Sequence, residues 1–235
     1  MAERARRNLP GIREEDCYGW TYGSVAAVGT PRAGQEYLQS LLRQWRFNVD
    51  KLLELPEGME RTAWVGEHLR QVCIELGFYV SQLHLECTEK ECPEMCAVAT
   101  SYYCAAHGQP QLCPAIQYAV HTLDQAGRLV STSAYAKAAD ASRPLSSSSS
   151  SSHVAETKQY QSMVRRLYRI FAHSYFHHRE FFERQESATY LYARFVRLAR
   201  KYELAPEAQI IIPDLPTTIE PSSVPDSAPS SQKQR

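Results

Sequence analysis

The chain has 235 residues, of which 43% are hydrophobic, so it is long enough to bury one sizeable core. Lysine plus arginine and aspartate plus glutamate each number 26, so no net field draws the molecule onto DNA, RNA or an anionic membrane. We therefore expect a single domain and no nucleic-acid partner.

The chain begins with a charged segment, MAERARRNLPG, that lacks the run of about 7 to 15 apolar residues of a secretory signal. No stretch approaches the roughly 18 continuous apolar residues needed to cross a bilayer. We expect a cytoplasmic protein without direct membrane insertion, associating with Golgi or other endomembranes only through partners. Its seven cysteines would then face reducing conditions, where thiols are more often metal ligands or core residues than disulfides.

Residues 1–32 are polar and interrupted by proline and glycine, but they hold the aromatic residues Tyr18, Trp20 and Tyr22. We predict an extended arm whose aromatic residues pack on the body, with a partner-binding anchor as the alternative. From Gln35 to Leu53 apolar residues recur every three or four positions, which is typical of an amphipathic helix.

A second helical pattern runs from Trp64 to Leu83, and its apolar stripe ends just before Cys87. The following segment, CTEKECPEMC, is typical of a loop. A third helix is predicted after Pro114, because proline is tolerated in a first turn, and its pattern fades near Gly127.

An uninterrupted serine tract, Ser146 to Ser152, has nothing apolar to offset the entropy of ordering it. We predict a disordered loop over about 138–156 that can hold phosphorylation sites. A fourth helix is predicted over about 157–183 and a fifth over about 187–202, with Ser187 as its N-cap. The proline- and serine-rich tail, 213–235, is expected to fray, so the pattern predicts an all-α domain over 33–212.

Cysteine and histidine spacing gives the strongest chemical signal. Cys87 and Cys92 form a C-x4-C pair, and the segment HSYFHH follows about eighty residues later. Two thiolates and two imidazoles suit tetrahedral zinc, which would tie the two segments together. On an ideal helix His173 lies about 40° from His177 and about 140° from His178, so spacing alone favours His177 as the second imidazole.

Two alternatives to this site remain open from spacing. Cys104, His107 and Cys113 form a C-x2-H-x5-C pattern that, with Cys96 nearby, offers a rival site, and the other alternative is buried thiols and surface imidazoles without metal. Four protein ligands would leave no position for a reactive water, which favours a structural ion. Motifs such as H-E-x-x-H, G-x-S-x-G and the phosphate-binding glycine loops are absent, so we expect no enzyme and keep a zinc hydrolase as a remote alternative.

Several segments resemble the Mob (Mps one binder) family: LPEG at 55–58, EHLRQ at 67–71, CTEKECPEM at 87–95 and RRLYRIFAHSYFHH at 165–178. Others resemble its phocein branch rather than the branch that activates kinases of the Hippo and mitotic-exit pathways: CAAHGQPQLCPAI at 104–116, HTLD at 121–124 and IFAHSYFHHREFF at 170–182. The resemblance covers about residues 8–215.

The resemblance implies an all-helical fold with a four-helix-bundle core, flanking helices and one structural zinc. The family's C-x4-C and H-x4-H ligand pairs fall on Cys87, Cys92, His173 and His178. This ligand pattern selects His178 over His177. The flexible histidine side chains or a local distortion of the helix must then make up the larger angle between His173 and His178 around the helix axis. Cys104 and Cys113 match positions of the phocein branch that are not the family's metal ligands, so we expect them to be core or loop residues.

The resemblance also implies a binding role. Arg165, Arg166 and Arg169 match basic residues that contact a phosphothreonine in Mob proteins that recognise phosphopeptides, and a solvated basic helix face is the alternative. Implied partners are striatin-type scaffolds, germinal-centre kinases and the type 2A protein phosphatase of a STRIPAK-like complex. A kinase coactivator of the Hippo type and a zinc-dependent nucleic-acid binder are the alternative functions.

Overall fold

The computed structural model describes residue 13 and residues 33–45, 47–132 and 150–215. The predicted arm apart from residue 13, the serine-rich segment up to residue 149 and the tail after residue 215 lie outside these ranges. In chain order the elements are α1 (Ala33–Trp45), α2 (Val49–Leu52), α3 (Arg61–Leu83), β1 (Cys96–Ala97), β2 (Thr100–Ser101), α4 (Ala115–Thr132), α6 (Ser150–His177), α7 (Arg179–Thr189), α8 (Leu191–Lys201) and the 3-10 helix η2 (Glu207–Gln209). The described chain is therefore mostly helical, with one short antiparallel hairpin that the sequence pattern did not predict.

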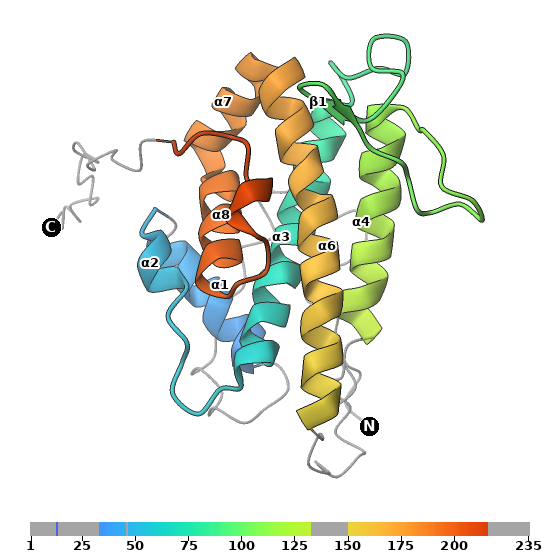
Figure 1. The fold of residues 1–235 in the computed structure, drawn as a ribbon. Coiled ribbons are helices and arrows are strands. Elements are labelled where there is room, and N and C mark those ends of the chain that lie inside the picture. The colour runs from blue at the N-terminus through green and yellow to red at the C-terminus, as the bar shows by residue number, and fades with distance from the viewer. Residues whose placement is uncertain (1–12, 14–32, 46, 133–149, 216–235) are drawn as a thin grey trace, which may run out of the picture.

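The central helix is α3, which packs against α1, α4, α6 and α8. Trp64, Leu69 and Leu76 are fully buried along it, and buried residues occur on most of its sides, as expected of a helix surrounded by others. Figure 1 shows α3, α4 and α6 running side by side along the molecule, with α1, α2 and α8 grouped together. The helix predicted from Trp64 to Leu83 is confirmed.

Two interactions fasten α8 to this core. Phe171 of α6 packs against Tyr192 and Phe195 of α8, with ring centroids 5.6 and 5.1 Å apart. Arg194 of α8 forms a buried ion pair with Glu75 of α3 and donates to both carboxylate oxygens. Since an unpaired charge at this depth would be costly, the pair fixes the position of α8 against α3.

Several predicted helix boundaries were wrong. The helix expected over 35–53 is interrupted after α1, because the side chain of Asn48 accepts a hydrogen bond from the Lys51 amide (3.2 Å) and starts a new helix there. Helix α4 continues past Gly127 to Thr132, and α6 already begins at Ser150 inside the predicted loop. Local apolar pattern underestimates both helices: α6 starts with polar residues, and α4 carries Leu129 and the buried Val130 beyond the glycine.

The region predicted to form the fourth and fifth helices contains three helices in the structure, α6, α7 and α8. The chain leaves the helix at His178 and again at Tyr190, whose φ of 53° is left-handed. Ser187 does not cap α8, since it lies within α7 and its hydroxyl donates to the Arg184 carbonyl. The carboxylate of Glu186 caps α8 instead, accepting from the amides of Tyr192 and Ala193 at 2.8 and 2.9 Å.

No helix within the described ranges has both the length and the apolar character that a membrane span requires.

The approach of α6 to α3 depends on a glycine. A Cβ added at Gly66 would lie 2.7 Å from the hydroxyl oxygen of Tyr160, whose ring is buried and whose hydroxyl donates to Glu156. A Cβ added at Gly77, later in the same helix, would meet nothing within 4 Å. The two glycines therefore form a matched pair for testing the packing.

We expect Gly66→Ala to lower the free energy of unfolding by about 1 to 3 kcal/mol, because the new methyl group displaces a buried ring. Gly77→Ala should raise it by up to about 1 kcal/mol, since alanine loses less backbone entropy than glycine in a helix. Urea unfolding of the purified protein measures both changes. A Gly66→Ala protein as stable as the wild type would contradict the close contact between α3 and α6.

Candidate functional site

Four side chains from two distant segments converge where the loop after α3 meets the end of α6. They are Cys87, Cys92, His173 and His178, and their ligating atoms all lie within 4.8 Å of one another. Cys87 follows the end of α3, where its amide donates to the Leu83 carbonyl (2.8 Å), and both histidines come from the junction of α6 and α7. In Figure 1 this junction is at the top of the molecule, beside β1.

The spacing of these atoms fits a tetrahedral metal ion. Cys87 Sγ lies 3.5 Å from His173 Nε2, and Cys92 Sγ lies 3.4 Å from His178 Nε2. Zinc bonds of about 2.3 Å to sulfur and about 2.0 Å to nitrogen, at a tetrahedral angle, would separate sulfur from nitrogen by about 3.5 Å. The four donors can therefore hold such an ion with little movement.

One histidine is oriented by the backbone behind it. His173 is 1% exposed, and its Nδ1 donates to the carbonyl oxygen of Cys96 at 2.8 Å. This bond places the proton on Nδ1 and leaves the lone pair of Nε2 facing Cys87, as in many metal sites where a carbonyl fixes the tautomer of a ligand. Cys96 thus contributes its carbonyl oxygen to this site.

Burial favours the uncharged forms of these groups. It raises the pKa of the Cys87 thiol to about 12, an effect increased by the nearby Cys92. It also lowers the pKa of His173 to about 4, against the opposite effect of its hydrogen bond to Cys96. The neutral imidazole is the form that binds metal, whereas the thiols need a cation to stabilise their anions. Two thiolates would balance the charge of one divalent ion.

The backbone explains why His178 rather than His177 joins the group. His178 has φ −134° and ψ 56°, outside the helical region, and it separates α6 from α7. His177 stays in the helix, stacks on His173 with ring centroids 4.7 Å apart, and places its Nε2 3.4 Å from Cys96 Sγ. The ideal helix geometry that favoured His177 assumes a helix continuous through both histidines, whereas α6 ends at His177 and His178 lies beside Cys92.

The rival cysteine pattern is divided between two places. Cys104, His107 and Cys113 lie together with His121 of α4, while Cys96 lies apart beside His177. Sequence reasoning did not single out His121 as a ligand, because no spacing rule links it to the loop before it.

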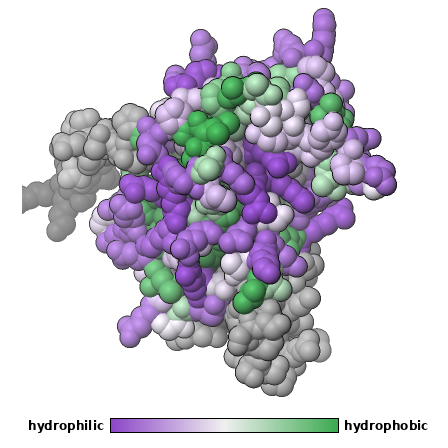
Figure 2. Space-filling model, in the orientation of Figure 1, coloured by the Kyte–Doolittle hydropathy of each residue, from purple (hydrophilic) through white to green (hydrophobic). Residues whose placement is uncertain are grey.

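The three arginines lie half-buried along α6 beside α4. Arg169 Nη1 donates to the Tyr118 hydroxyl at 2.7 Å, and its guanidinium lies over the ring of Tyr102, 4.5 Å from the centroid. Arg166 Nη1 donates to the side-chain oxygen of Gln125 at 2.8 Å. None of these partners is a carboxylate, so the contacts orient the guanidinium groups and leave their charge unneutralised. Figure 2 shows largely hydrophilic side chains across the middle of the face where α6 and α8 lie.

Comparison with known proteins supports the resemblance. The profile of the Mob1/phocein family matches residues 41–213, which include both segments of the metal-ligand group. The chain is 37% identical over 209 residues to MOB kinase activator-like 4 of Drosophila melanogaster, covering 88% of this chain and 89% of that protein. It is 34% identical over 212 residues to MOB-like protein phocein of Caenorhabditis elegans, covering 90% and 91%.

Replacing either neighbouring histidine tests the ligand assignment. We expect His178→Ala to remove about one equivalent of bound zinc relative to the wild type and to lower the Tm, because a structural ion contributes directly to folding. His177→Ala should retain the wild-type zinc content. Elemental analysis of gel-filtered protein measures both. Zinc loss from His177→Ala with none from His178→Ala would reverse the assignment.

Proposed function

The chain belongs to the Mob1/phocein family, and from that premise we propose that it is a non-catalytic adaptor stabilised by structural zinc. The observation that carries the proposal is the convergence of Cys87, Cys92, His173 and His178 from two segments. Four protein donors complete a tetrahedral shell, whereas a catalytic zinc keeps one position for water or substrate. The site is suited to holding the loop after α3 against α6.

The surroundings of the site support a structural role. Cys87 and His173 are 0% and 1% exposed, so solvent and substrate have little access to an ion between them. The loop they fasten, residues 84–114, contains only the two short strands as regular structure. A loop of this length needs some other source of order, which a zinc ion would supply.

We propose that Arg165, Arg166 and Arg169 bind a phosphothreonine on a partner protein. Arg166 and Arg169 are oriented by Gln125, Tyr118 and the face of Tyr102, so part of the entropic cost of ordering them is already met. Arg165 makes no polar contact with another described residue. Three guanidinium groups within two turns of one helix can make several charge-assisted hydrogen bonds to a phosphate.

The proposed partners follow from the phocein-like segments. We propose a striatin-type scaffold, a germinal-centre kinase and, through the complex, the type 2A protein phosphatase, as in a STRIPAK-like assembly in the cytoplasm or at endomembranes. The similarity to MOB-like protein phocein supports this branch. The similarity to a relative named MOB kinase activator-like 4 favours the second candidate function, a kinase coactivator.

A peptide experiment tests the arginine site. We expect Arg166→Ala combined with Arg169→Ala to weaken binding of a threonine-phosphorylated kinase peptide at least about tenfold, because charge-assisted hydrogen bonds to the phosphate are lost. The matched control is Arg184→Ala, an exposed arginine of α7 paired with Glu86 at 2.7 Å. Isothermal calorimetry with phosphorylated and unphosphorylated peptides gives the affinities. Equal affinity of the wild type for both peptides would contradict the proposal.

Purification of the full-length chain from cells tests the partners. We expect a striatin-type scaffold and the phosphatase subunits to copurify with it, and His178→Ala to lose them because the loop after α3 is released from α6. Mass spectrometry of the purified complex identifies the proteins. Recovery of kinases of the Hippo or mitotic-exit type without any scaffold would favour the coactivator alternative.

A further inference from the structure

A thiol and an imidazole that are not ligands in the Cys87 group face each other at the end of α6. Cys96 belongs to β1 and His177 is the last residue of α6, and Cys96 Sγ lies 3.4 Å from His177 Nε2. Together with His173 they form a further group of potential metal donors among the described residues. We propose that Cys96 and His177 bind a zinc ion that is shared with the same two residues of a second copy of this chain.

His173 cannot serve this ion as well as the first one. Its Nε2 faces Cys87 at 3.5 Å, and its Nδ1 donates to the carbonyl oxygen of Cys96 at 2.8 Å, so both ring nitrogens have partners. Its ring stacks on that of His177, with centroids 4.7 Å apart, and this contact holds the second imidazole beside Cys96. The group therefore offers one thiol and one imidazole to another ion, which is half of a tetrahedral shell.

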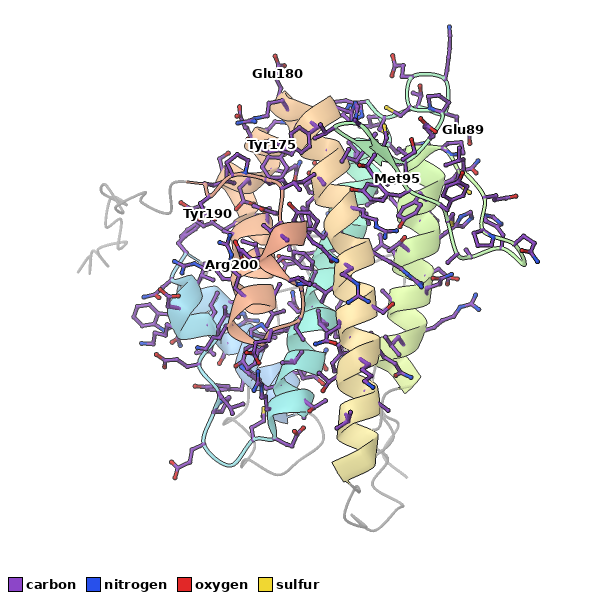
Figure 3. All side chains as sticks on the ribbon, viewed as in Figure 1. Glu89, Met95, Tyr175, Glu180, Tyr190 and Arg200 are labelled. Atoms are coloured by element: carbon purple, nitrogen blue, oxygen red, sulfur yellow. The ribbon has the colours of Figure 1, made fainter. Side chains whose placement is uncertain are left out.

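The geometry of this pair suits zinc. The sulfur–nitrogen separation of 3.4 Å is close to the value of about 3.5 Å expected across a tetrahedral ion. The two donors come from β1 and α6, which pack against each other. Figure 3 labels Met95, which precedes Cys96, and Tyr175, two residues before His177, and both lie near the upper part of α6. Because packing already brings the donors together, an ion would meet a preorganised pair.

Both donors are accessible to another molecule. His177 is exposed and Cys96 is half-buried, whereas Cys87 and His173 of the first group are buried. An ion held by only two protein donors keeps two positions for other ligands. Such an ion is held weakly by one chain, since it makes only half of the protein bonds of a structural site. Ligands from another molecule would complete the shell.

A second copy of the chain supplies the two donors that one chain lacks. Two copies related by a two-fold axis through the ion give two thiols and two imidazoles, which is the donor set of the Cys87 group. Two thiolates balance the charge of one divalent ion, so this ion and the one proposed beside it would not repel each other strongly. The chain has a formal net charge of zero at pH 7, so no long-range repulsion opposes the approach of two copies.

Exposed apolar side chains flank the pair. Phe176 directly precedes His177 and is 38% exposed, and Val98, two residues after Cys96, is 65% exposed. Val98 lies in the turn between β1 and β2, so its side chain stands at the tip of the hairpin. Contact of both side chains with a second copy would remove apolar surface from water and add to the binding that the ion provides.

The competing explanations need only one chain. In one of them, Cys96 and His177 are alternative ligands for the first ion and exchange with Cys92 and His178. In the other, the thiol and the imidazole form a hydrogen bond without metal. Both explanations predict a monomer in the presence of zinc, so the oligomeric state separates them from a shared ion.

Sedimentation velocity of the full-length protein, with a small excess of zinc and a non-thiol reductant, tests the shared ion. We expect the wild type to have about twice the mass of one chain. Cys96→Ser and His177→Gln should each have the mass of one chain under the same conditions. The matched control is Cys73→Ser, a half-buried cysteine of α3 outside the donor groups, which should form the dimer. A weak chelator should return the wild type to a monomer.

Three results would overturn the shared ion. They are a wild type that stays monomeric with zinc, a dimer that forms equally without zinc, and a dimer that both Cys96→Ser and His177→Gln retain. The reductant excludes a disulfide between two copies of Cys96, and His177→Gln keeps the thiol while removing the imidazole. Far-UV circular dichroism should show that both variants keep the helix content of the wild type, as expected for substitutions at accessible positions.

The shared ion and the first ion have separate readouts. The shared ion is bound only while the dimer persists, and dilution on a column without added zinc separates the two copies. The zinc content of gel-filtered protein therefore does not include the shared ion, and Cys96→Ser should leave that content unchanged. A monomeric wild type that still holds zinc after gel filtration would reject the shared ion and leave the first site standing.

Discussion

The meeting of two thiols and two imidazoles at the end of α6 is the constraint on which the functional part of the molecule depends. The helices are held by their own core, but the segment between α3 and α4 has little regular structure. This segment meets the helices where Cys87 contacts His173, a residue 86 positions later in the chain. Without a cation, this junction would hold two neutral thiols beside two imidazoles. Contacts between these neutral groups stabilise a fold far less than their bonds to a metal ion would.

The same segment positions the binding surface that we propose. Tyr102 follows the hairpin β1–β2, and Tyr118 lies on α4, so the two tyrosines that contact Arg169 come from the segment before α4 and from α4 itself. Both are uncharged, and they restrict the guanidinium without neutralising it. Tyr102 belongs to the segment that meets the helices at the Cys87 junction, so order in this segment would help to hold this partner of Arg169 in place.

Most of the fold could be predicted from the sequence, because helix periodicity is a local property. The apolar residues of α3 recur at helical spacing over its whole length, and the structure has a helix there. The boundaries were less predictable: α6 starts inside a serine tract, and α8 is capped by the Glu186 carboxylate six residues before the amide it binds. Such ends depend on contacts between elements, which a periodic pattern does not contain.

The sequence by itself determined which chemistry is available: two cysteine pairs and a group of histidines at the end of a helix, with three arginines along it. Only the tertiary structure decided which of them meet. His178 joins Cys92 because the chain leaves the helix at that residue, and α7 then buries Phe181 and Phe182. His121 lies 3.5 Å from the thiol of Cys104, although the two are 17 residues apart in the chain. The direction of a side chain follows from packing across the whole chain, which spacing along the sequence does not specify.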